Sequence, residues 1–100
     1  MVGVLARFEF RDGFDEEIGR FFAEGRVIVE GQPATTGWYA ARVTPTTYAA
    51  FAVFADDADR DRLLAAGGPA LSRSYAHLFA APPTFEKVDV VQHREPRSEA

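Results

Sequence analysis

The side chains that could do acid–base chemistry in this chain are few, because it has two histidines and no cysteine. His77 lies in the segment SYAHLF, whose bulky residues occupy an apolar helix face and leave His77 at its edge. A histidine titrates near neutral pH, so His77 could act as a general base. The alternative is a partly exposed polar residue, and we expect His93 to face solvent. Because the two histidines have no fixed spacing to carboxylates, we expect no metal site.

Two arginines could stabilise negative charge on a substrate oxygen. Arg42 and Arg7 lie on expected strands, and an arginine in a pocket can stabilise a phenolate or a developing oxyanion. The alternative is a structural ion pair, with Glu9 or Asp89 as the partner, because an unpaired internal charge is costly. We assign Arg42 to catalysis, together with His77, and Arg7 to substrate binding.

Aromatic side chains supply the remaining candidates. Tyr48 and Tyr75 could hydrogen-bond a phenolic or quinone oxygen, and Phe51 would add an apolar wall. Trp38 and Tyr39 point to opposite faces of a strand, so one faces the helices, where a pocket would lie, and the other faces away. Each of these aromatic residues could also be ordinary core. We assign Tyr48 to catalysis, and we assign Trp38, Tyr39, Phe51 and Tyr75 to substrate binding.

The elements that position these residues follow the order β-α-β-β-α-β. The stretch WYAARVTPTTYAAFAVF holds two strand-length runs joined by a turn, which indicates a β-hairpin. This order predicts an α+β, ferredoxin-like sandwich with a four-stranded antiparallel sheet and both helices on one face. The expected elements are strands over 2–11, 36–43, 47–54 and 85–91, a helix over about 14–30, and a second helix from Asp56 to Pro82-Pro83, interrupted at Gly67-Gly68-Pro69.

Length and charge exclude several classes of protein. One hundred residues are enough for one domain. The formal net charge of -4 argues against a nucleic-acid partner. No apolar run is long enough to span a membrane. The N-terminal MVGVLARFEF alternates like a strand and unlike a signal peptide. We therefore expect a cytoplasmic protein without disulfides.

Three segments carry a resemblance to a known family. TGWYAARV, YAAFAVFADDADRDRLL and ALSRSYAHLFAAPPTFEKVDVV together resemble the antibiotic biosynthesis monooxygenase-like proteins. The most specific parts are Gly37-Trp38-Tyr39, the stretch from Phe54 to Arg60, and PPTFEKVDV. The resemblance implies a dimeric α+β barrel domain over 1–91. The polar, charged composition of residues 92–100 indicates a tail.

What the resemblance implies for chemistry depends on the branch of the family. Better-studied relatives oxidise polycyclic phenols to quinones without a metal or flavin, and others degrade haem. Relatives often carry a histidine on the second helix, where this chain has Arg62 before Leu63. The haem-degrading branch uses an asparagine on the first strand, and this chain has no asparagine. The resemblance therefore favours a reaction without a cofactor.

Three functions stay open at this point. The first is a cofactor-independent monooxygenase that acts on a small phenol- or quinol-like aromatic. The second is a non-catalytic dimer that binds a small hydrophobic ligand, and the third is a structural homodimer without a pocket. We expect a homodimer, because apolar residues on both sheet faces would leave one face exposed in a monomer. We also expect Gly67-Gly68-Pro69 to be a mobile gate, although a plain kink between two helices would fit equally well.

Overall fold

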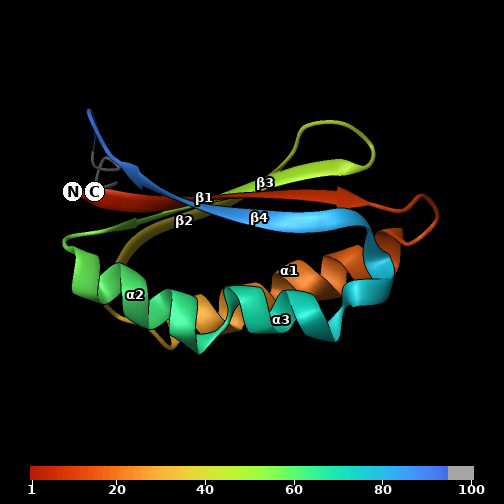
Figure 1. Ribbon diagram of the computed structural model, residues 1–100, viewed down its shortest axis with the longest axis horizontal. Helices are drawn as coiled ribbons and strands as arrows, with labels where there is room; N and C mark the ends of the chain where they lie inside the picture. The colour runs from red at the N-terminus through yellow and green to blue at the C-terminus, as the bar shows by residue number, and fades with distance from the viewer. Residues whose placement is uncertain (95–100) are drawn as a thin grey trace, which may run out of the picture.

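The computed structural model describes residues 1–94. The chain forms a four-stranded antiparallel sheet with all its helices on one side (Figure 1). The element order confirms the ferredoxin-like α+β fold. None of the described helices is long and apolar enough to cross a membrane. The elements are β1 (Val2–Phe10), α1 (Asp15–Glu30), β2 (Thr35–Arg42), β3 (Thr47–Phe54), α2 (Asp57–Ala66), α3 (Gly68–Ser74), a 3₁₀ turn η1 (Ala76–Leu78) and β4 (Phe79–Asp89).

The sheet has the strand order β2-β3-β1-β4, so β1 is central and β2 and β4 are edge strands. Alternation along β1 buries its even-numbered residues, among them Phe8 and Phe10, against the helices. The β2–β3 hairpin pairs Trp38 with Ala52 and Arg42 with Tyr48. The two residues of a pair lie on the same face of the sheet, and successive pairs alternate between the two faces. The Trp38–Ala52 and Arg42–Tyr48 pairs therefore share one face.

The helix α1 begins and ends where its sequence indicates. Its first turn carries three acidic residues, which the positive end of the helix dipole favours, and Gly31 follows its last residue. The apolar stripe of α1 includes Ile18 and Phe21, which are buried against the sheet. Phe21 of α1 and the phenylalanines of β1 form one densely packed aromatic cluster.

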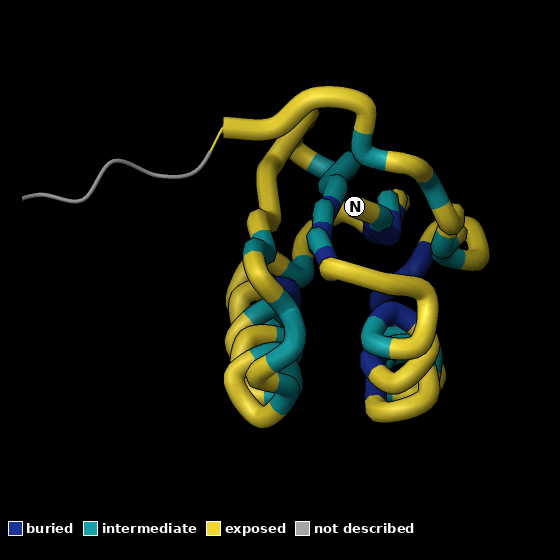
Figure 2. The backbone as a smooth tube through the Cα atoms, turned by 90° about the vertical axis from the view of Figure 1, so that its left-hand side faces the viewer, coloured by how far each residue is buried: buried dark blue, intermediate teal, exposed yellow. Residues whose placement is uncertain are grey.

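The second helical region is two helices, as the glycine pair predicts. Asp56 caps α2, and its Oδ1 accepts a hydrogen bond from the backbone N–H of Asp59 at 2.9 Å. The helix is interrupted at Gly67, where a Cβ atom would lie 2.6 Å from a side-chain carbon of Ile28 on α1. The glycine therefore lets the α2–α3 junction lie directly on α1. Figure 2 shows the two helical rows beneath the same sheet face.

Strand β4 begins earlier than the sequence predicts. The sequence predicts a helix ended by Pro82-Pro83 and a strand over 85–91, but the helix ends at Ser74 and β4 already begins at Phe79. The two prolines lie inside this edge strand, where a missing N–H group breaks no bond to a second neighbour. The pairing of β4 with β1 is irregular opposite 7–10, next to the prolines. An edge position therefore accommodates a proline pair that would end a helix.

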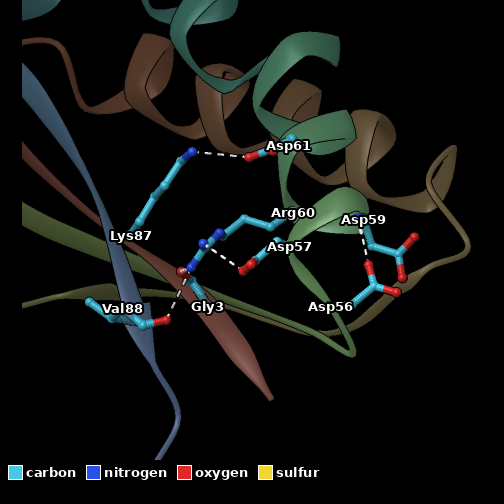
Figure 3. Close-up of polar contacts among 8 residues, drawn as sticks. All are labelled: Gly3, Asp56, Asp57, Asp59, Arg60, Asp61, Lys87 and Val88. Carbon is cyan, nitrogen blue, oxygen red and sulfur yellow. Dashed lines mark hydrogen bonds and ion pairs between the residues drawn. The ribbon is translucent and has the colours of Figure 1, made fainter.

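A buried arginine ties α2 to the sheet (Figure 3). Arg60 is 8% exposed, and its Nη1 donates to the backbone carbonyls of Gly3 and Val88, both at 3.3 Å. Its Nη2 donates to Asp57 Oδ1 at 2.9 Å. The Nε of Arg60 is buried without a hydrogen-bond partner in the described part of the chain. Arg60 thus joins the beginning of α2 to β1 and to β4.

Candidate functional site

An apolar cavity lies between the inner face of the sheet and the two helical rows, with a volume of about 80 Å³. Trp38 is the one lining residue whose side chain carries a polar atom. The sheet, α1 and the α2–α3 pair each supply part of the wall. The lining residues are Val4, Phe21, Phe22, Gly25, Ile28, Val29, Trp38, Ala50, Ala52, Leu63, Leu64, Gly68, Leu71 and Phe85.

This cavity is smaller than an aromatic ligand requires. Small-molecule sites typically measure about 300–1,000 Å³, and even benzene binds in a cavity of about 150 Å³. A ring system would therefore fit only if part of the cavity wall moved.

Gly25 on α1 lies near both of the other walls. A Cβ atom on Gly25 would lie 3.8 Å from Cζ2 of Trp38 on β2 and 3.9 Å from Cδ2 of Leu71 on α3. Both distances are ordinary van der Waals contacts, so the absent side chain leaves free space in the cavity. Trp38 thus faces the helices, as expected for one of the two residues Trp38 and Tyr39.

A polar pair stands beside this apolar cavity, on the same sheet face. Arg42 Nε donates a hydrogen bond of 2.7 Å to Tyr48 Oη, and the guanidinium carbon lies 5.3 Å from the centre of the Tyr48 ring. The Tyr48 ring stacks on Phe22, a lining residue, with 5.3 Å between ring centres. Ala50, the next inward-facing residue on β3, also lines the cavity. The pair therefore adjoins the cavity at its β2–β3 side.

The Arg42–Tyr48 pair has unused hydrogen-bond donors. Tyr48 Oη accepts from Arg42, so its own hydrogen points elsewhere. Within residues 1–94, no carboxylate is hydrogen-bonded to Arg42, and its terminal N–H groups have no side-chain partner. A cation with free donors at the edge of an apolar cavity can hold an ionised oxygen of an otherwise apolar ligand.

His77 and Tyr75 lie outside the cavity lining. His77 Nε2 is 2.8 Å from Glu17 Oε2, and the His77 side chain is 58% exposed. Tyr75 donates a hydrogen bond of 2.8 Å to Glu24 Oε1. This hydrogen bond, together with burial of the ring, raises the pKa of Tyr75 above its usual value. Both side chains reach from the α3–η1 segment to α1, and their predicted contact with substrate stays a prediction.

The other predicted binding residues face away from the helices. Arg7 lies on the outer sheet face, as do Tyr39, which is 62% exposed, and Phe51. Glu9, one of the expected partners of an arginine, instead accepts a hydrogen bond from Thr47 Oγ1 at 2.8 Å. The structure therefore brings Trp38, Arg42 and Tyr48 together on the inner face and leaves Arg7, Tyr39 and Phe51 on the outer one.

Sequence reasoning missed most of the residues that line the cavity. Of the lining residues, it assigned only Trp38 to a site. It did not assign Phe22, Gly25 and Ile28 of α1, or Leu71 and Phe85, to any site. The signal that could have found them is the glycine in the middle of an otherwise bulky stripe, because it marks missing volume on a buried helix face.

The donor set offers little to a metal or to haem iron. Among the described residues, no three His, Cys, Asp or Glu side chains gather closely enough to hold a metal ion. The residues that line the cavity include no histidine, cysteine, tyrosine or methionine, which are the side chains that ligate haem iron.

Comparisons with known proteins place this architecture among solved structures. No family model matches the chain, and no curated protein is similar to it. A protein of unknown function from Nitrosomonas europaea is 28% identical, with a TM-score of 0.84, over 97% of this chain and 95% of that one. A variant of SnoaB, a cofactor-independent oxygenase from Streptomyces nogalater, is 23% identical, with a TM-score of 0.72, over 92% and 94% of the two chains. An antibiotic biosynthesis monooxygenase is 15% identical, with a TM-score of 0.78, over 92% and 100%. These likenesses establish the fold.

Proposed function

The chain has the fold of the antibiotic biosynthesis monooxygenase-like proteins, and from this premise we propose that it is a cofactor-independent monooxygenase. Its substrate would be a small, phenol- or quinol-like aromatic that ionises easily. The fold alone does not carry this proposal, because one fold hosts many functions. The support comes from the residues that surround the cavity.

The observation that carries the proposal is the Arg42–Tyr48 pair beside an apolar cavity. The cavity wall would hold the ring system, and the free donors of Arg42 and Tyr48 would bind an ionised oxygen at the rim. A charge-assisted hydrogen bond from a cation favours the ionised form of the ligand over the neutral form, and a bound ring system would shield this exposed pair from water. Arg42 and Tyr48 would thereby lower the pKa of a bound phenol.

An ionised aromatic can then react with molecular oxygen itself. For a hydroxyanthrone, the ring methylene loses both C–H bonds and gains a C=O bond. One atom of O₂ becomes the new carbonyl oxygen, and the other leaves as water with the two hydrogens. All the electrons that reduce O₂ come from the substrate. The chain's contribution is to bind the anion, orient it, and exclude water from the reacting carbon.

A second function keeps the same site without the chemistry. The residues that line the cavity include no histidine and no carboxylate that could serve as a general base. His77, the base predicted from the sequence, is 58% exposed, lies beside Glu17 of α1, and is not among the residues that line the cavity. This arrangement also suits a non-catalytic dimer that binds a small hydrophobic ligand.

Oxygen uptake by the purified, metal-stripped protein tests the two functions. The probe is 1,8-dihydroxy-9-anthrone, and turnover should consume equal amounts of O₂ and anthrone. Arg42→Gln should lower the rate by about 100-fold, as the loss of an oxyanion donor does in other enzymes. The matched control is Arg26→Gln, which removes an exposed arginine that pairs with Glu30 within α1. The control should match the wild type.

Three outcomes would decide against the oxygenase. Turnover that starts only after flavin or iron is added contradicts the cofactor-free reaction. An Arg42→Gln rate equal to that of the wild type contradicts the role of Arg42. Tight binding of the anthrone without any oxygen uptake supports the binding protein instead.

We also propose that the chain is a homodimer that pairs through the outer face of its sheet. Leu5, Phe51 and Val53 lie half-exposed on that face, and Tyr39 is 62% exposed there. No helix covers this face in the described structure (Figure 1). Exposed apolar patches of this kind mark interfaces in soluble proteins. The cytoplasmic location expected from the sequence stays a prediction.

A further inference from the structure

We propose that α3 is a lid over the cavity and that two side-chain pairs, Tyr75–Glu24 and His77–Glu17, latch it to α1. The proposal rests on the proposed function only in taking the cavity as the place where a ligand binds. It names the part of the wall that moves and the contacts that control the movement.

The helix α3 is the shortest element that contributes to the cavity wall. Ala50 and Ala52 belong to β3, which is hydrogen-bonded to a strand on each side. The helix α1 is fixed by the aromatic cluster that Phe21 forms with β1. In contrast, α3 has seven residues, and it contributes Gly68 and Leu71 to the cavity wall.

Both ends of α3 suit a hinged segment. At the beginning of α3, the buried Gly67 ends the preceding helix α2. The Gly67 carbonyl accepts a hydrogen bond of 2.7 Å from the Leu71 N–H, which is the first helical bond of α3. The absence of a side chain at Gly67 lets this junction lie against Ile28 of α1. At its end, the helix stops at Ser74 and passes into the short η1 turn. Rotation of α3 about Gly67 would leave the residues of α2 and β4 outside the moving segment.

The latch joins this segment to α1 at two points on one helix face. Tyr75 Oη donates to Glu24 Oε1 at 2.8 Å, and His77 Nε2 lies 2.8 Å from Glu17 Oε2. The two glutamates are seven positions apart, so they lie about two helical turns from each other on the same side of α1. The Tyr75 and His77 rings stack with 6.3 Å between their centres, which makes the two contacts one unit.

The latch is also in contact with the cavity wall. The Tyr75 ring packs edge-on against Phe21, a lining residue, with 5.5 Å between ring centres. Release of Tyr75 would therefore remove one packing contact of Phe21 and let Leu71, on the same segment as Tyr75, move away from α1. Opening between α1 and α3 enlarges the cavity toward the size that an aromatic ligand needs.

Hydrogen exchange in the ligand-free protein tests the lid directly. Tyr75→Phe removes the hydroxyl and keeps the ring, and Glu24→Gln removes the charge of its partner. Both variants should speed amide exchange across 68–74 by about threefold to tenfold. Exchange in β1 and β3 should not change. The matched control is Glu30→Gln, the same chemical change on α1 at a residue that pairs with Arg26 within that helix; it should match the wild type.

The association rate of a fluorescent phenol supplies the second measurement. With 1-naphthol as the probe, both latch variants should bind faster by a similar factor, while Glu30→Gln should not. Unchanged exchange over 68–74 in both latch variants would overturn the proposal. Faster exchange in α1 and α3 alike would also overturn it, because it would indicate general loosening. The exchange measurement needs no ligand and no turnover, so its result is independent of whether the chain is an oxygenase.

Discussion

A methyl group added at Gly25 should stabilise the protein and at the same time close its cavity. Gly25 lies inside α1, and a Cβ atom there would meet Trp38 Cζ2 at 3.8 Å and Leu71 Cδ2 at 3.9 Å. Gly25→Ala therefore fits without displacing a neighbour. Gly19 lies in the same helix, and a Cβ there would have nothing within 4 Å. Gly19→Ala is thus a control that changes the helix without touching the cavity.

The magnitudes follow from two contributions. Replacing glycine by alanine inside a helix stabilises it by about 1 kcal/mol, and this gain applies to both variants. At Gly25 the methyl group is also buried against Trp38 and Leu71, which adds about 0.8 kcal/mol. For a chain of this length, about 1 kcal/mol corresponds to a rise in Tm of about 4–8 °C. Gly25→Ala should therefore melt about 3–6 °C above Gly19→Ala.

Ligand binding should move in the opposite direction. One methylene of excess volume in an apolar pocket changes affinity by about 10-fold or more. Titration with 1-naphthol should show weaker binding to Gly25→Ala and unchanged binding to Gly19→Ala. Calorimetric Tm values and the two affinities together check the reasoning. Equal Tm values for the two variants would refute the contact with Trp38 and Leu71, and equal affinities would refute the cavity as the binding site.

Three further predictions concern stability and assembly. Arg60→Met should lower the free energy of unfolding by about 1–3 kcal/mol in urea titrations, because it removes the buried hydrogen-bond donors to the sheet. The control Arg62→Met changes an exposed residue two positions on and should change the free energy of unfolding by about 0.5 kcal/mol or less. Phe51→Glu on the outer sheet face should give a monomeric mass by light scattering. The control Val27→Glu, on the exposed side of α1, should keep the dimeric mass. A monomeric mass of the wild type at micromolar concentration would contradict the proposed interface. The raised pKa of Tyr75 means that the fold favours its neutral form, so this contribution to stability is complete below about pH 10 and disappears as the pH rises through the folded-state pKa. The difference between the ultraviolet titrations of the wild type and Tyr75→Phe near 295 nm should therefore give a pKa of Tyr75 above its usual value; a pKa at or below that value would contradict this.

Periodicity in the sequence was sufficient to predict the fold. The two-residue alternation of β1 and the stripe of α1 were strong because both elements have one buried face. The predicted end of the last helix and the predicted start of β4 were wrong. Pro82-Pro83 was interpreted as a helix terminator, because the sequence alone does not show that this segment is an edge strand. Strand order is a property of the whole chain, and no local pattern reveals it.

The candidate site was predictable only in part, for a similar reason. The hairpin fixes which residues face each other, so a turn placed between 43 and 47 is enough to bring Arg42 opposite Tyr48. The partner of His77 is 60 positions away in the chain, and its position depends on how α3 packs on α1. Cavity volume depends on that packing too. Pairing between residues that a short loop connects can therefore be predicted from sequence, and contacts between distant helices cannot.

The proline pair of β4 has a consequence for the behaviour of this protein at high concentration. An open sheet edge attracts strands from other molecules, and long, flat edges of this kind promote fibril growth. Pro82-Pro83 removes two successive N–H groups from the outer strand, and the irregular pairing next to it disturbs the flatness of that edge. Intermolecular sheet extension is therefore hindered at this part of the β4 edge, which makes β2 the edge on which we expect unwanted self-association to start.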